Sequence, residues 1–269
     1  MPIATDITFW PTRGFFVPGA TERFGARFGD KGTHTSRTLM LAELSDVLDA
    51  TSPDATRRHY AAAVIEANCL GKPTASSRVL TNQRLGELYA LDPSVPLFRA
   101  LRRLWPTDPK GRPLLALLVA LARDPLLAAS ASAVLSLPEG AELLRDPVRS
   151  ALRKVTAERL NDATLDKVAR NVASSWSQAG HLAGRTFKRR RLVEATAASA
   201  AFALFIAHAA GFRGNEMLAS GWVTALDTTP SEAQGLALEA KRLGLIDLRA
   251  AGDVFEVAFE RLAQTPGRS

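Results

Sequence analysis

The chain has 269 residues, of which 46% are hydrophobic and 23% are charged. This composition supports one large domain or two smaller ones with substantial cores, and it excludes global disorder, collagen-like repeats and a disulfide scaffold. The single cysteine, Cys69, cannot form an internal disulfide, so we expect a reducing, cytoplasmic location. No apolar segment of signal-peptide type follows Met1. The two apolar runs, residues 114–122 and 195–212, are expected to be buried core helices and not membrane spans.

The net charge of +7 is concentrated in one stretch of the chain. Residues 145–191 contain twelve lysines and arginines against four acidic residues, a balance of +8. The rest of the chain has 22 basic and 23 acidic residues, a balance of −1. A positive field concentrated in this way favours a polyanionic partner over a general effect on solubility.

Composition divides the chain into three predicted segments: an arm at 1–34, an N-terminal helical domain at 35–158, and a basic C-terminal domain at 159–269. The arm contains five glycines and six aromatic residues without helical or strand periodicity. We expect its aromatic side chains to pack back onto the protein. The alternative is an arm that touches nucleic acid.

The N-terminal domain is predicted to begin with three helices. The first covers residues 36–50, the second starts at a cap formed by Ser52 and Pro53, and the third runs from a Thr74 cap to about residue 91. The last two outline a helix-turn-helix, and polar residues of the third, Arg78 and Arg84 among them, would be its readers. Residues 94–137 are predicted to form two or three mostly buried helices divided by prolines.

The basic segment contains a predicted amphipathic helix that ends at Gly180. Its apolar face includes Leu165, Val172 and Trp176 at helical spacing. A basic loop or strand follows the helix. A polar helix followed by a basic extension is typical of a helix that lies along a nucleic-acid groove while the extension binds phosphates. The predicted nucleic-acid-binding residues of this segment are Lys167, Arg170, Asn171, Gln178, Arg185, Lys188, Arg189, Arg190 and Arg191.

The C-terminal region has a local signature of its own. Ser231 and Gln234 have capping-box spacing at the start of a predicted helix, and residues 245–248 and 254–259 read as a hairpin around a turn at 249–253. A helix followed by a small hairpin outlines a winged helix. Its exposed positions have no positive excess, so the wing is expected to pack rather than to read DNA.

The expected fold class is therefore mostly α and multi-helical, with a helix-turn-helix-like N-terminal part and a C-terminal winged-helix-like part that contains one small β-hairpin.

The sequence contains no complete catalytic constellation. Residues 14–19 have the spacing of P-loop glycines, but Ala20 stands in place of the lysine that reaches the phosphates in such a loop. The four histidines are isolated along the chain, and Asp162 and Asp166 adjoin basic residues, which favours helix-start charges over a metal cluster. We expect neither a catalytic site, a metal site nor a cofactor, and therefore a protein that is not an enzyme.

A resemblance adds to these inferences. Residues 67–78 (ANCLGKPTASSR), followed by Gln83, Arg84 and Leu85, resemble the N-terminal region of the BrxA family of bacteriophage exclusion (BREX) defence systems. The resemblance covers roughly residues 40–260, is diffuse and includes no catalytic motif. It implies a helical, non-enzymatic, DNA-binding protein with a subdomain similar to bacterial antitermination factors.

Charge and resemblance together lead to one expectation about function. The protein is expected to be a nucleic-acid-binding component of a bacterial anti-phage system, with duplex DNA as its partner and other defence-system proteins as further partners. Two alternatives stay open. The same patch could bind acidic proteins in a helical scaffold, or it could bind RNA, because phosphate contacts do not distinguish the two nucleic acids.

Overall fold

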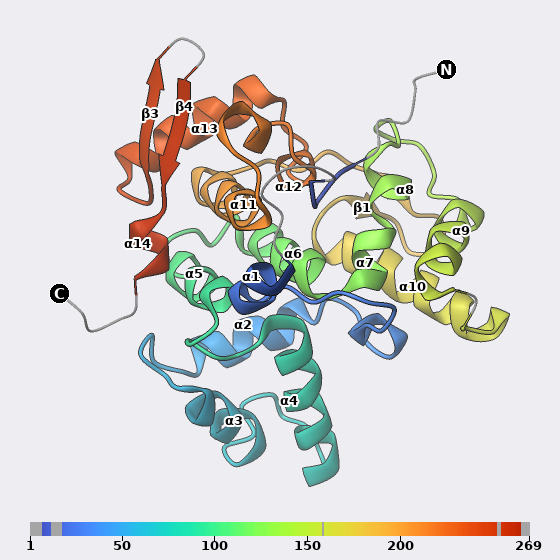
Figure 1. Cartoon of the computed structure of the whole chain (residues 1–269). Coiled ribbons are helices and arrows are strands. Elements are labelled where there is room, and N and C mark those ends of the chain that lie inside the picture. The colour runs from blue at the N-terminus through green and yellow to red at the C-terminus, as the bar shows by residue number, and fades with distance from the viewer. Residues whose placement is uncertain (1–6, 12–17, 158, 252–253, 265–269) are drawn as a thin grey trace.

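The computed structural model describes residues 7–11, 18–157, 159–251 and 254–264. It shows a mostly α-helical protein with two small antiparallel sheets, so the helical fold class is confirmed (Figure 1). The helices of the first half are α1 (Pro18–Phe24), the 3-10 helix η1 (Thr33–Thr35), α2 (Leu41–Asp49), α3 (Arg57–Ile65), α4 (Ala75–Tyr89), α5 (Pro96–Leu104), α6 (Arg112–Arg123), α7 (Pro125–Ala129) and α8 (Ala131–Leu135).

The second half contains the remaining helices and the strands. Its helices are α9 (Arg145–Thr156), α10 (Asp162–Gln178), α11 (Ala197–Ala210), the 3-10 helix η2 (Gly214–Met217), α12 (Gly221–Thr224), α13 (Pro230–Arg242) and α14 (Glu260–Ala263). Strand β1 (Leu182–Ala183) pairs with β2 (Arg189–Arg190), and β3 (Asp247–Ala251) pairs with β4 (Val254–Ala258).

Two apolar helices form the centre of the molecule (Figure 1). Residues 114–122 of α6 are all buried, as are residues 197–207 of α11, so the two predicted core helices are confirmed. Helix α11 packs against α5, α6 and α13. Among the described residues no single helix is long and apolar enough to cross a membrane. Helix α11 and residues 214–224 reach that length and apolarity only when taken together, and the two segments are bent by 116° relative to each other.

The three predicted segments share one cluster of buried hydrophobic residues, which extends from Phe9 to Leu262. The described part of the N-terminal arm packs onto the protein, as expected. Phe9 and Trp10 both lie edge-on to the ring of Trp222, whose Nε1 donates a hydrogen bond to the Phe9 carbonyl at 2.7 Å. The arm also contains a helix, α1, that its composition did not predict. The predicted arm residues 12–17 lie outside the described residues.

Helices α3 and α4 pack against each other and project at the bottom of Figure 1. Thr74 caps α4 as predicted, because its hydroxyl accepts a hydrogen bond from the Ser77 backbone at 3.1 Å. The cap predicted at Ser52 and Pro53 is wrong. Ser52 instead begins a turn in which its carbonyl accepts from the Ala55 backbone, and Thr56 caps α3.

The predicted C-terminal hairpin is present as β3 and β4. Pairing continues to Ala251 opposite Val254, so the turn is shorter than predicted, and residues 252–253 lie outside the described chain. Helix α13 precedes the hairpin and begins with Pro230 in its first turn. Its capping residues are accordingly Thr229 and Glu232, not the predicted Ser231 and Gln234.

A buried polar cluster ties the N-terminal segment to α7 and α10. The Asp124 carboxylate accepts hydrogen bonds from the backbone of Leu126 and Leu127, which caps α7, and from the His34 backbone at 3.1 Å. The His34 ring lies with Nδ1 2.8 Å from Asp124 and Nε2 2.8 Å from the Ser175 hydroxyl. Burial raises the pKa of Asp124, but its interactions with His34 and the backbone hydrogen bonds outweigh burial, so the pKa lies below its usual value.

We predict that Asp124→Ala lowers the free energy of unfolding by about 3–5 kcal/mol, because it leaves several buried donors without an acceptor. Urea unfolding at pH 7 measures the change. The control is Asp49→Ala, which removes a carboxylate that is 58% exposed and 4.0 Å from Arg112; its effect is expected to stay within about 0.5 kcal/mol. Similar small losses in both variants would contradict the role given to Asp124.

Candidate nucleic-acid interface

The basic segment folds around a small sheet. Strands β1 and β2 are joined by residues 184–188, and residues 140–143 pair with the other edge of β2. The Leu143 backbone donates to the Lys188 carbonyl at 2.8 Å, and the Arg190 backbone donates to the Ala141 carbonyl at 2.8 Å. Of the loop or strand predicted after α10, a strand is present at Arg189–Arg190, and hydrogen bonds hold it on both sides.

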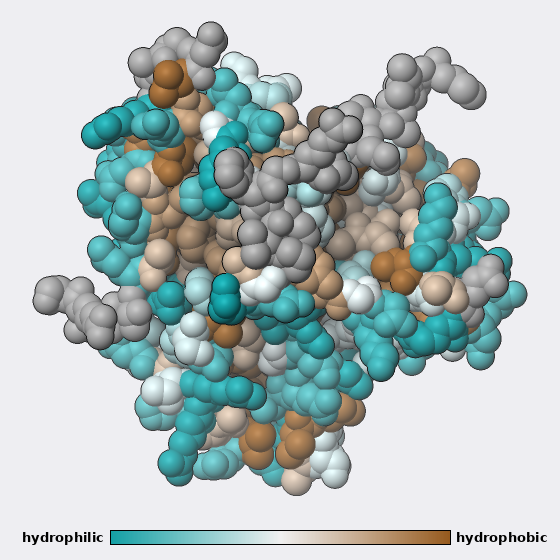
Figure 2. All heavy atoms as spheres, viewed as in Figure 1, coloured by the Kyte–Doolittle hydropathy of each residue, from teal (hydrophilic) through white to brown (hydrophobic). Residues whose placement is uncertain are grey.

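A groove of about 660 Å³ lies between this sheet, α9 and α10. Four cationic side chains line it: Arg145, Arg170, Arg185 and Lys188. The floor includes small and apolar side chains of α10, Ala169 and Ala173. Two carboxylates, Glu142 and Asp166, also line the groove, but Arg149 lies 3.2 Å from Asp166 and offsets its charge. The side of the molecule where α9 and α10 lie, on the right in Figure 2, is largely hydrophilic.

The loop between β1 and β2 depends on one glycine. Gly184 has a φ of +101°, and a Cβ atom at this position would lie 2.1 Å from the Phe187 carbonyl oxygen. Glycine alone accommodates both constraints. The resulting tight turn leaves Arg185 exposed and holds Phe187 with 64% of its surface exposed at the groove.

Three of the predicted nucleic-acid-binding residues are brought together in this groove: Arg170, Arg185 and Lys188. Lys167 lies exposed one turn earlier on α10. Arg189 is exposed on β2, and Arg191 is exposed beside a different cavity, with Lys110. The sequence analysis did not select Arg145 or Phe187, although both lie inside the basic segment.

Arg190 was predicted to bind nucleic acid, but its side chain is buried. It is 1% exposed and forms an ion pair with Asp227, which is itself 6% exposed. Neighbouring residues of a strand face opposite sides, so Arg190 points inward while Arg189 and Arg191 point outward. A guanidinium buried in this way has no surface left for a phosphate.

Asn171 and Gln178, which were also predicted to bind nucleic acid, are half-buried and form hydrogen bonds within the protein. Asn171 donates to the His34 carbonyl at 2.8 Å. Gln178 accepts from the Leu41 backbone at 3.2 Å, at the start of α2, and donates to the Thr38 hydroxyl at 2.9 Å. Part of the polar face of α10 therefore packs on the N-terminal segment, while Lys167 and Arg170 on the same helix stay exposed.

Of the two predicted readers on α4, Arg84 is held by an ion pair. Arg84 lies 2.7 Å from the Glu87 carboxylate, which also accepts from Gln83. Arg78 is half-buried, and its Nε has no hydrogen-bond partner among the described residues. The exposed large hydrophobic side chains of α4 are Val79 and Leu80.

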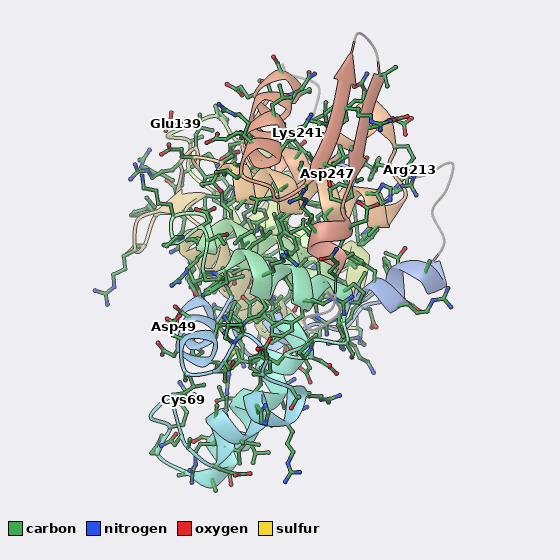
Figure 3. The ribbon with its side chains drawn as sticks, turned by 90° about the vertical axis from the view of Figure 1, so that its left-hand side faces the viewer. Asp49, Cys69, Glu139, Arg213, Lys241 and Asp247 are labelled. Carbon is green, nitrogen blue, oxygen red and sulfur yellow. The ribbon has the colours of Figure 1, made fainter. Side chains whose placement is uncertain are left out.

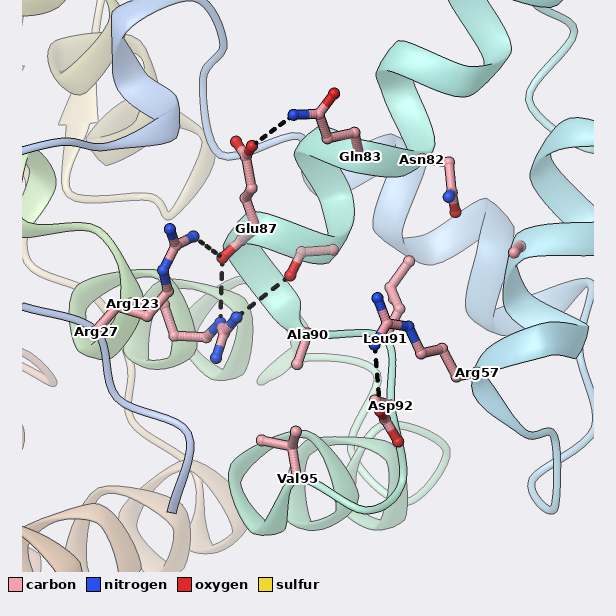
Figure 4. Close-up of a pocket in the computed structure, with 12 residues that line it drawn as sticks. Arg27, Arg57, Asn82, Gln83, Glu87, Ala90, Leu91, Asp92, Val95 and Arg123 are labelled. Atoms are coloured by element: carbon pink, nitrogen blue, oxygen red, sulfur yellow. Dashed lines mark hydrogen bonds and ion pairs between the residues drawn. The ribbon is translucent and has the colours of Figure 1, made fainter. Parts of the chain in front are cut away.

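A cavity of about 430 Å³ lies beside the end of α4, and two arginines that line it, Arg27 and Arg123, cap this helix (Figure 4). Arg27 donates to the Glu87 carbonyl at 3.1 Å, and Arg123 donates to the carbonyls of Glu87 and Gly86 at 3.2 and 3.3 Å. These guanidinium groups satisfy carbonyls in the last turn of the helix. Burial lowers the pKa of Arg123 to about 10.

Another cavity lies under the C-terminal hairpin. Arg213, Lys241 and Asp247 line it (Figure 3). Asp247 lies 3.4 Å from Arg261, and Glu256 also lines the cavity. The hairpin therefore combines both signs of charge, as its sequence predicts.

The cluster of Asp124, His34 and Ser175 has the residue types of a hydrolase triad, but each of its side chains is at most 1% exposed. Ser175 additionally donates to the Asn171 carbonyl at 3.0 Å. We interpret the cluster as structural, because its hydrogen bonds link the N-terminal segment to α7 and α10. Among the described residues no group of three or more histidine, cysteine, aspartate or glutamate side chains is placed to hold a metal ion.

Comparison with known proteins gives no further guidance, because neither a protein-family model nor a curated protein matches the sequence significantly.

We predict that Arg190→Ala and Arg189→Ala differ sharply in stability although they are neighbours. Arg190→Ala leaves the buried Asp227 unpaired and is expected to lower the free energy of unfolding by about 3–5 kcal/mol. Arg189→Ala removes an exposed side chain and is expected to change it by about 0.5 kcal/mol or less. Thermal and urea unfolding measure both. Equal effects would show that Arg190 is not buried as described.

The stability of the protein is expected to fall as the pH drops from about 6.5 to about 4. Burial lowers the pKa of His181 to about 4, with Asp227 opposing the shift, so the unfolded chain binds this proton more readily than the folded one. The loss attributable to His181 is about 3 kcal/mol. Urea unfolding across this pH range measures it, and His181→Gln is expected to flatten that part of the profile. An unchanged profile in this variant would contradict the assignment.

Proposed function

We propose that this protein binds nucleic acid, with duplex DNA as the expected partner, through the basic groove and the exposed cations beside it. The observation that carries the proposal is the gathering of Arg145, Arg170, Arg185 and Lys188 around one groove. Within the described part of the chain, none of these four side chains forms an ion pair with a carboxylate.

The pairing pattern within residues 145–191 supports this location. Arg149, Arg153, Arg159 and Arg190 form ion pairs with aspartates of the same chain, which largely offset their charges. Exposed cations with no such partner remain available to phosphates, and phosphate contacts position a duplex without specifying its sequence. Lys167, Arg189 and Arg191 extend this cationic surface beyond the groove.

The role in phage defence rests on the resemblance to the BrxA family and is part of the proposal, as is the absence of catalysis. A winged-helix-like role for α13 and the β3–β4 hairpin belongs here as well. The mixed charges of Asp247, Arg249 and Glu256 favour a packing wing. Acidic proteins are the alternative partner, since the same cations would bind carboxylates.

The test is a triple variant with a charge-matched control. Arg170→Ala, Arg185→Ala and Lys188→Ala together are expected to weaken duplex binding strongly and to reduce the slope of log affinity against log salt by about 0.9 for each phosphate that is no longer neutralised. The control, Lys241→Ala with Arg242→Ala and Arg249→Ala, removes the same charge from exposed positions at α13 and the hairpin. It is expected to bind almost normally. Fluorescence anisotropy with 20-base-pair DNA and RNA duplexes gives both quantities.

Three results would contradict the proposal. The control could lose binding while the groove variant keeps it, which would make the hairpin the binding surface. The wild-type protein could show no dependence on salt. Finally, poly-glutamate could compete as well as DNA at equal charge concentration, which would favour acidic proteins.

A further inference from the structure

The groove has features that phosphate binding alone does not need. Its rim carries two large exposed hydrophobic side chains, Phe187 at 64% and Leu144 at 62% exposure. Leaving such side chains in water is unfavourable, and their exposure beside a cationic surface indicates contact with a ligand that has both charge and apolar area.

The depth and composition of the groove agree with this indication. Three of the five α10 residues that line it are small, Ala169, Ala173 and Ser174, and the groove has a volume of about 660 Å³. That volume is within the range of pockets that enclose small organic ligands. An intact duplex is a broad surface with its bases stacked inside, so its backbone would rest on the rim cations without filling the space below them.

We infer that the groove binds an unpaired nucleotide, with the base stacked on Phe187 and the adjoining phosphates held by Arg170, Arg185 and Lys188. This inference rests on the proposed function and names the nucleic-acid structure that the site prefers. An aromatic side chain offers a planar face to any base, so the preference would not depend on base identity. The Gly184 turn supports it by fixing the backbone that carries Phe187.

A carboxylate in the groove separates the place of the base from the place of the phosphate. Glu142 lines the same groove, and within the described part of the chain it forms no ion pair. This carboxylate would repel a phosphate, but it would accept a hydrogen bond from an N–H group, which every base carries on its Watson–Crick edge. The phosphate therefore belongs at the cationic rim and the base belongs inside the groove.

The experiment compares three DNA probes labelled with the same dye: a perfect 20-base-pair duplex, the same duplex with one bulged nucleotide in the centre, and a 20-nucleotide single strand. Wild-type protein is expected to bind the bulged duplex about tenfold more tightly than the perfect one, as stacking of one base on an aromatic side chain provides. Photocrosslinking of 5-iodouracil placed at the bulge, followed by mass spectrometry, is expected to label Phe187.

Two variants test the groove without changing its charge. Phe187→Ala removes the stacking face, and Ala173→Leu fills the floor. Both are expected to abolish the preference for the bulge while perfect-duplex affinity and its salt slope stay at wild-type values. The control Leu192→Ala removes a similarly exposed hydrophobic residue, 56% exposed, that lines a different cavity; it is expected to keep the preference. Thermal unfolding establishes that each variant is folded.

The outcomes separate this inference from the proposed function. Salt-dependent binding with equal affinity for the perfect and bulged duplexes would overturn the inference and leave the proposed function standing. A bulge preference that survives in Phe187→Ala and Ala173→Leu would also overturn it. Binding to none of the probes would overturn both.

Discussion

The buried ion pair between Arg190 and Asp227 is the interaction on which the basic surface depends. It fixes which side of β2 faces the core, and this orientation sends the side chains of Arg189 and Arg191 outward. Asp227 also accepts from the Val193 backbone at 2.9 Å, so the chain after β2 is held by the same carboxylate. Desolvating two charges is costly, and the paired geometry offsets that cost only while both partners are present.

The basic side chains of the groove also differ from those elsewhere in the molecule in what they contact. Arginines on α4, α6 and α9 cap helices or neutralise acidic side chains, and they contribute to the fold. The cations at the β1–β2 loop have no comparable role in the fold. A cluster of like charges left near one another weakens the compact state slightly. Its presence beside an exposed phenylalanine is therefore better explained by a ligand than by folding.

The sequence was sufficient to predict most helices because each has a local signal. Thr74 caps α4, and the apolar runs of α6 and α11 are long enough to identify core helices. The local signals failed where the partner lies far away in the chain. Nothing near Arg190 points to Asp227. Asn171 and Gln178 of α10 looked solvent-exposed because their partners lie far away in sequence, in the segment around residues 34–41. The sequence alone does not distinguish Phe187 from a core phenylalanine. Only the structure shows that the turn at Gly184 leaves its ring exposed beside the groove.

The attachment of the chain's first described residues to α12 has a consequence for how the protein is made. The Phe9 carbonyl is the acceptor for the Trp222 indole, 213 positions later in the sequence. During synthesis the early segment emerges from the ribosome long before Trp222 is made, so its aromatic side chains lack this packing partner during that time. Contacts of such wide sequence separation also slow folding. This part of the core is therefore completed only after Trp222 has left the ribosome.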